Sequence, residues 1–119
     1  MTRFILVRHG ETEWNRIERF RGRADVPLNE TGLSQAEATG RRVAAEWKPS
    51  AIYSSPLSRA IKTAEAIARQ THSPVQIHPD LVDIDYGEWQ GLTPEEARQC
   101  YPAEISAWYH QPELAHIPG

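Results

Sequence analysis

The feature that most restricts the fold is the N-terminal stretch FILVRHGETEWN, in which four apolar residues run directly into Arg8-His9-Gly10. An apolar run of this length, Phe4–Val7, predicts a parallel β-strand that is covered on both faces. Arg8 and His9 then lie at the carboxyl end of that strand, which is the edge where α/β sheets bind ligands. Gly10 allows a tight turn or a close backbone approach beside them.

Segments typical of strands and helices alternate along the rest of the chain. Residues 31–47 carry apolar side chains at helical spacing, and residues 51–54 indicate a second strand. Residues 54–70 indicate a second helix, with Ser55 as its cap and Pro56 at the first helical position. A weaker third strand over residues 74–78 precedes two short helices, the first opened by a capping box of Thr93 and Glu96. This order predicts an α/β layer fold with a mostly parallel sheet, as one domain or part of one.

Composition argues against several classes of function. The 13 Lys and Arg residues against 16 Asp and Glu give a net charge of -3, so we expect neither nucleic acid nor an anionic membrane as a partner. No stretch approaches the roughly 20 apolar residues of a membrane span, and the N-terminal apolar run is too short for a signal peptide. Cys100 is the only cysteine, which predicts no internal disulfide, a half-buried structural role and a cytoplasmic location.

Arg8, His9 and Arg59 are the candidate chemical groups. A guanidinium matches the oxygens of a phosphate, and a histidine can act as a proton shuttle, a metal ligand or a nucleophile. Arg59 lies in the first turn of the predicted second helix, where free N–H groups and the helix dipole favour an anion. Two arginines flanking His9 would bind a dianion and keep the imidazole neutral. These residues alone leave open a structural histidine and an exposed helical arginine.

Metal binding is not indicated. The spacings typical of zinc ligands are absent, and the other histidines stand in polar, loop-like contexts where we expect solvated side chains; they are His72, His78, His110 and His116. The four tryptophans are expected to pack in the core rather than to stack on a ligand.

Three motifs together resemble the signature of the histidine phosphatase superfamily, also called the phosphoglycerate mutase-like family. LVRHGETEWN matches its first block, and SSPLSRAIKTAE and DIDYGEWQGLTPEE match the next two in order and spacing; PLNETGLSQA fits the start of its first helix. The resemblance covers the whole chain. It implies a three-layer α/β/α fold over residues 1–119, truncated before the later strands of the family.

The resemblance also implies phosphoryl transfer through a phosphohistidine, without a metal or another cofactor. His9 would attack phosphorus while its other ring nitrogen is held by a hydrogen bond, and Arg8 and Arg59 would bind the phosphoryl oxygens. The remaining substrate-binding residues implied by the family are Gly10, Glu11, Thr12, Asn15, Arg21 and Gly22.

The proton donor departs from the family pattern. Relatives carry a glutamate where this chain has Asp83, which is one methylene shorter. Asp83 is the expected general acid, and Glu88, five residues further on, is the alternative.

The family's second catalytic histidine, in a His-Gly turn after a later strand, has no counterpart here, since neither His110 nor His116 has the required context. Two explanations remain: a fragment of a longer phosphatase, which we favour, or a complete short protein with a rearranged fold that could form a homodimer. The expected function is a phosphomonoester hydrolase acting on a small phosphorylated metabolite. The alternatives are mutase-type phosphoryl transfer with a bisphosphate cofactor, and a phosphate-binding scaffold without turnover.

Overall fold

The computed structural model describes residues 1–119 and contains a two-stranded parallel sheet. Strand β1 (Ile52–Ser54) pairs with β2 (Val75–Ile77), with Ile52 opposite Val75. Helix α3 (Ser58–Thr71) connects the two strands, so these three elements form a βαβ unit. The predicted strands over residues 51–54 and 74–78 are confirmed, each slightly shorter than expected.

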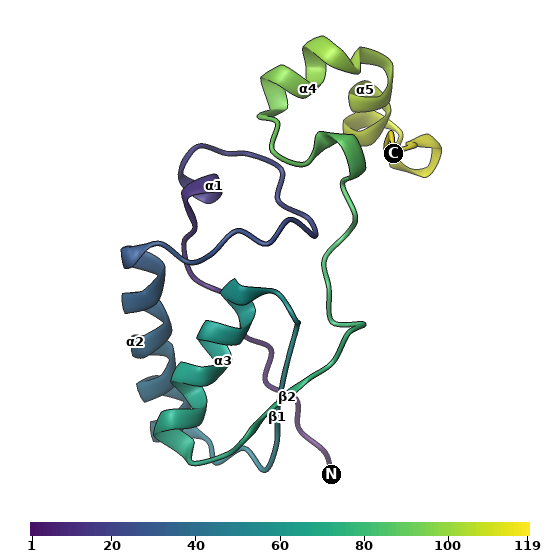
Figure 1. Ribbon diagram of the computed structural model, residues 1–119. Coiled ribbons are helices and arrows are strands. Elements are labelled where there is room, and N and C mark those ends of the chain that lie inside the picture. Colours follow the sequence, from purple (N-terminus) through teal and green to yellow (C-terminus); the bar gives the residue numbers. More distant parts are fainter.

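Helix α2 (Glu30–Glu46) lies alongside α3, and both helices cover the same side of the sheet (Figure 1). Asn29 caps α2, because its side chain accepts a hydrogen bond from the backbone N–H of Gly32 at 2.8 Å. The core between the helices and β1 consists of Val43, Ile52, Ala64 and Ile67. The α/β class and the helix expected over residues 31–47 are therefore confirmed.

A second core lies in the C-terminal part of the chain, and Figure 1 shows it at the opposite end of the molecule from the helix pair. Its elements are the 3-10 helix η1 (Gly87–Trp89), α4 (Pro94–Cys100), α5 (Pro102–His110) and the 3-10 helix η2 (Pro112–Leu114). Trp89, Ala97 and Ile105 form its fully buried centre. The predicted capping box of Thr93 and Glu96 is present at the start of α4.

The segment between α1 (Glu13–Arg16) and α2 joins the two cores. The backbone N–H of Phe20 donates to Leu92 at 2.9 Å, and the N–H of Gly91 donates back to Phe20 at 2.9 Å. Arg19 adds hydrogen bonds to the Gly91 carbonyl and to the Glu96 carboxylate. This segment therefore holds the C-terminal helices against the N-terminal part of the chain.

Three local predictions were wrong. Phe4–Val7 forms no strand: it makes no backbone–backbone hydrogen bond, and Phe4 and Leu6 are 84% and 93% exposed. A strand buried on both faces needs a paired neighbour and two covering layers, and this sheet consists of β1 and β2 with both helices on one side. Helix α3 begins at Ser58, not at Pro56, with Ser55 accepting a hydrogen bond from Leu57. Cys100 is exposed at the end of α4.

The four tryptophans take part in packing as expected. Trp47 contacts the first core, Trp89 and Trp108 stack edge-to-face in the second, and Trp14 lies against Gly91. No helix of the structure is both long enough and apolar enough to cross a bilayer.

Candidate active site

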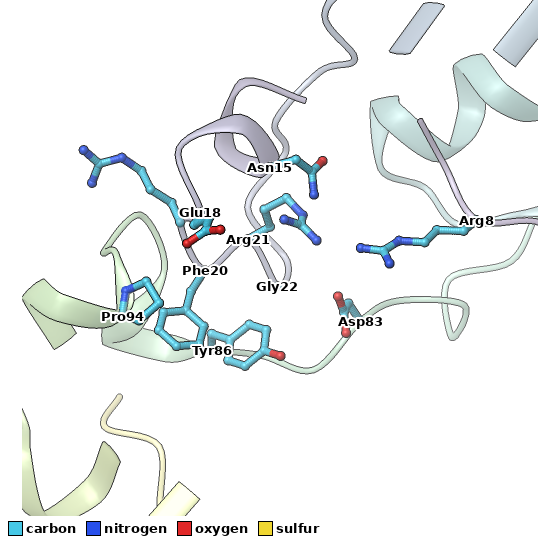
Figure 2. A pocket seen from close by; sticks show the side chains of 10 residues that line it. Arg8, Asn15, Glu18, Phe20, Arg21, Gly22, Asp83, Tyr86 and Pro94 are labelled. Atoms are coloured by element: carbon cyan, nitrogen blue, oxygen red, sulfur yellow. The ribbon is translucent and has the colours of Figure 1, made fainter. Parts of the chain in front are cut away.

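A cavity of about 290 Å³ opens between the two cores, and Figure 2 shows its lining side chains. It is rich in arginine, with two carboxylates and two aromatic rings on its walls. The lining residues are Arg8, Asn15, Glu18, Arg19, Phe20, Arg21, Gly22, Asp83, Tyr86 and Pro94. Four of these ten residues were expected from the sequence to bind substrate: Arg8, Asn15, Arg21 and Gly22. Asp83 was the expected general acid.

Arg8, Arg21 and Asp83 converge on this cavity from three separate parts of the chain (Figure 2). Arg8 follows the N-terminal segment, Arg21 stands in the loop after α1, and Asp83 lies in the extended segment that leaves β2. The guanidinium groups of Arg8 and Arg21 point toward one another, with the Asp83 carboxylate below them in this view. Such an arrangement favours a bound anion.

His9 follows the cavity-lining Arg8 in the sequence; it is half-buried and does not itself line the cavity. Its Nδ1 lies 2.7 Å from the carbonyl oxygen of Gly10, so Nδ1 carries the proton and Nε2 is left with a free lone pair. Burial is the main cause that lowers the pKa of His9, although the hydrogen bond to Gly10 opposes it. The positive charges of Arg59, Arg21 and Arg8 lower that pKa further.

Arg59 lies in the first turn of α3, as expected, and is only 2% exposed. Its two terminal nitrogens donate to the carbonyl oxygens of Ala24 and Gly22, at 2.6 and 2.7 Å. Burial lowers the pKa of Arg59, and the charge of Arg21 lowers it further. Arg59 does not line the cavity. Its two hydrogen bonds hold the loop that carries Arg21.

The turn after His9 is pressed against the start of α2. A Cβ on Gly10 would lie 2.7 Å from the Gly32 carbonyl oxygen, which explains why glycine is needed there. Glu11 accepts a hydrogen bond from Asn29 at 2.8 Å, and its N–H donates to Gln35. These contacts point Glu11 toward α2 and not toward the cavity.

Thr12 and Asn15 form the capping box of α1. The Thr12 side chain is fully buried, and both its hydroxyl and its N–H donate to Asn15 Oδ1 at 2.9 Å. Asn15 lines the cavity, and its side-chain nitrogen Nδ2 makes no hydrogen bond to the protein. Of the two, Asn15 can therefore donate to a ligand, while Thr12 orients it.

The two candidate acids occupy different places. Asp83 lines the cavity, and its Oδ1 accepts a hydrogen bond from the N–H of Ile84 at 2.7 Å. Glu88 lies in η1, where the Tyr101 hydroxyl donates to it at 2.5 Å. Glu88 is thus hydrogen-bonded at the exposed surface of the C-terminal part, outside the cavity.

Sequence reasoning missed several lining residues. Glu18, Arg19 and Phe20 belong to a polar stretch whose pattern resembles a solvated surface, and Pro94 lies in the third motif without a predicted role in the site. Tyr86 also lies in the third motif without a predicted role in the site. Burial and the charge of Asp83 raise the pKa of its hydroxyl, while Arg21 opposes them. The lining residues come from segments far apart in the sequence, so no local pattern could predict that these segments lie side by side.

The remaining histidines, His72, His78, His110 and His116, are all exposed, as expected. The structure brings together no group of three or more His, Cys, Asp or Glu side chains that could hold a metal ion.

His9 is thus half-buried, with its Nδ1 held by the Gly10 carbonyl and its pKa lowered by burial and by three arginines, on an α/β scaffold. The family model of the histidine phosphatase superfamily (branch 1) matches residues 4–119, so the chain belongs to that superfamily. The resemblance drawn from the three motifs is confirmed.

Relatives in this superfamily include named phosphatases. The chain is 42% identical to the metal-independent phosphoserine phosphatase of Arabidopsis thaliana over 120 residues, covering 100% of this chain and 50% of that protein. It is 36% identical to phosphoserine phosphatase 1 of Hydrogenobacter thermophilus, covering 100% of this chain and 56% of the relative. The chain therefore spans about half the length of the curated relatives it matches.

The fold agrees with solved structures of the same class. YhfR of Bacillus stearothermophilus superposes with a TM-score of 0.83 at 37% identity, covering 92% of this chain and 54% of that one. The architecture is thus phosphoglycerate mutase-like, and this chain corresponds to about half the length of that structure.

Proposed function

We propose that this chain belongs to a phosphomonoester hydrolase that acts on a small phosphorylated metabolite through a phosphohistidine at His9. The observation that carries the proposal is the state of His9: its Nδ1 is held by the Gly10 carbonyl, and its pKa is lowered by burial and by three arginines. A neutral imidazole with a free Nε2 lone pair is the form that a nucleophile requires.

The reaction proceeds in two balanced steps. In the first, the Nε2 lone pair forms a bond to phosphorus while the phosphorus–oxygen ester bond breaks, and the leaving oxygen takes a proton from Asp83. In the second, the Asp83 carboxylate removes a proton from water, whose oxygen attacks phosphorus as the phosphorus–nitrogen bond breaks. Inorganic phosphate leaves, and both His9 and Asp83 return to their starting states.

Arginine charge takes the place of a metal ion in this scheme. Arg8 reaches the cavity directly, and Arg59 retains N–H groups beyond the two that bind Gly22 and Ala24. Their positive charge offsets the charge that develops on the phosphoryl oxygens in the transition state. Asn15 donates from its free amide nitrogen. The backbone of Gly10, Glu11, Thr12 and Gly22 supports the turns that present these groups.

Asp83 is the better candidate for the proton donor, because it lines the cavity and Glu88 does not. An aspartate has a shorter reach than the family's glutamate. The extended, exposed segment around Asp83 offers the backbone freedom to compensate.

The substrate is expected to be a phosphate monoester of a small polar molecule. Phosphoserine is the substrate named for two relatives, and the arginine-rich cavity suits such an anionic molecule. We further expect a cytoplasmic location, in keeping with the single exposed cysteine, and neither nucleic acid nor a membrane as a partner.

The test is acid-labile phosphorylation of this chain by a reactive donor such as p-nitrophenyl phosphate. Wild-type protein and the His116→Asn control should acquire the label, and His9→Asn should not. Asp83→Asn should slow labelling from a substrate with a poor leaving group, while Glu88→Gln should leave it unchanged. Phosphate binding without any label on His9 would support the scaffold instead. Dependence on a bisphosphate primer would support the mutase.

A further inference from the structure

We propose that Arg21 is a third phosphoryl-binding guanidinium, which holds the phosphate dianion from the side opposite Arg8. This assignment deepens the proposed function, on which it rests for the identity of the anion. The family resemblance assigned the loop of Arg21 to general substrate contact, whereas the structure assigns Arg21 to the phosphate group itself.

The first observation is the direction of the side chains. Arg8 and Arg21 enter one cavity from different segments, and their guanidinium groups face each other across it (Figure 2). Two facing cations repel, because each carries a full positive charge. An anion between them removes this repulsion and accepts hydrogen bonds from both.

The second observation is the pairing of the neighbouring arginines. Four arginines crowd the stretch from Arg16 to Arg23. Arg16 forms an ion pair with Glu13, and Arg19 forms one with Glu96. Arg21 forms none, and neither does Arg8. Arg23 has no ion pair either, but it donates to the carbonyl oxygen of Asp83 and does not line the cavity. Of the three arginines that line the cavity, Arg8 and Arg21 are therefore the two without a carboxylate partner.

The third observation is an unsatisfied donor. The Nε of Arg21 is buried and has no hydrogen-bond partner in the protein. A buried guanidinium nitrogen without a partner is costly, since it has lost its water and gained nothing in return. The loop cannot relax easily to expose it, because Arg59 holds the carbonyl oxygen of the next residue, Gly22, at 2.7 Å.

The electrostatic environment agrees with this geometry. Arg21 contributes to lowering the pKa of both His9 and Arg59. Burial together with Arg8 lowers the pKa of Arg21 itself, and the Asp83 carboxylate opposes that shift. The positive charge of Arg21 therefore acts at His9 as well as at Arg59. A dianionic monoester gains more from a third guanidinium than a monoanionic diester does, so Arg21 favours monoesters.

The test is the binding of inorganic phosphate to this chain at about pH 8, where a phosphate group is mostly doubly ionised. Calorimetric titration should show that Arg21→Gln weakens binding by about 10- to 100-fold, as expected for lost charge-assisted hydrogen bonds. Arg16→Gln removes a paired arginine from the same stretch and should bind as the wild type does. Arg21→Lys should give an intermediate affinity. Equal binding by Arg21→Gln and the wild type, or no phosphate binding by the wild type, would overturn the proposal.

A second measurement needs no variant and decides the case if Arg21→Gln does not fold. Phenylglyoxal modifies accessible arginines, and mass spectrometry locates each modified residue. Inorganic phosphate should protect Arg8 and Arg21 of the wild-type chain while Arg16 continues to react. Protection of Arg8 alone would refute the role of Arg21. Failure of His9 to accept a phosphoryl label, with protection of Arg21 intact, would refute the phosphohistidine mechanism and leave this inference standing.

Discussion

Arg59 donates a hydrogen bond to the carbonyl oxygen of Gly22 at 2.7 Å, across 37 residues of sequence. A second bond from the same guanidinium reaches Ala24. Asp25, the next residue, accepts a hydrogen bond from the N–H of Ser58 at 2.8 Å and so caps α3 from outside the helix. The first turn of α3 therefore sets the position of the loop that carries Arg21.

Replacement of Arg59 by lysine is expected to loosen this loop. A single ammonium cannot reproduce the two fork-like bonds to Gly22 and Ala24, and a buried carbonyl oxygen would lose its partner. The free energy of unfolding should fall by about 1–3 kcal/mol in urea titrations, and the amide of Arg23 should exchange faster with solvent. Arg41→Lys, on the exposed side of α2, serves as the control. Unchanged amide exchange in Arg59→Lys would contradict the positioning role.

The imidazole of His9 should titrate below its ordinary pKa of 6.5, because burial and the three arginines disfavour the charged form. Nuclear magnetic resonance of the ring nitrogens would measure the midpoint. Arg21→Gln should raise it, since one repelling positive charge is removed. In the unfolded chain His9 binds its proton at a higher pH than in the folded protein. Protonation of His9 should therefore lower the free energy of unfolding as the pH falls below about 6.5. A midpoint at or above the ordinary value would show that the site does not keep His9 neutral.

Gly32→Ala should destabilise the protein although alanine favours helices. A Cβ at Gly32 would lie 2.1 Å from the carbonyl oxygen of Glu11, so the turn after His9 would have to move away from α2. We expect a loss of about 1–3 kcal/mol in the free energy of unfolding, measured by urea denaturation, together with weaker phosphate binding. Ser34→Ala, at an exposed position of the same helix, should change stability by only a few tenths of a kcal/mol. Equal stability of the two variants would show that the contact is not tight.

Trp89 should be the most sensitive side chain of the C-terminal core. It is 0% exposed, and its indole N–H is buried without a partner. Trp89→Ala should cost about 3–5 kcal/mol through the cavity it leaves. Trp89→Phe should cost clearly less, because it keeps a ring and removes the unsatisfied donor. Thermal denaturation followed by near-ultraviolet circular dichroism would rank the stabilities of the two variants. A larger loss for Trp89→Phe than for Trp89→Ala would indicate that the indole N–H finds a partner in solution.

Some of these features could be predicted from the sequence because they depend on neighbouring residues. The capping box of Thr93 and Glu96 involves residues three apart, and the apolar spacing of α2 and α3 repeats every turn. The order of the three motifs was enough to indicate the superfamily. Phe4–Val7 was different, since a strand exists only where another strand pairs with it, and no local pattern reports whether that partner is present.

The amino-acid sequence was enough to predict the α/β class, the main helices, strands β1 and β2, the family, and His9 as the candidate nucleophile. Backbone hydrogen bonds and caps join residues a few positions apart, so their signals are local. Which arginines lack a carboxylate partner depends on how the chain folds. Arg16, Arg19, Arg21 and Arg23 look alike in the sequence, but folding pairs Arg16 and Arg19 with carboxylates and turns Arg21 toward Arg8. Ion pairing depends on distances between segments far apart in the chain, and these are set by packing rather than by spacing.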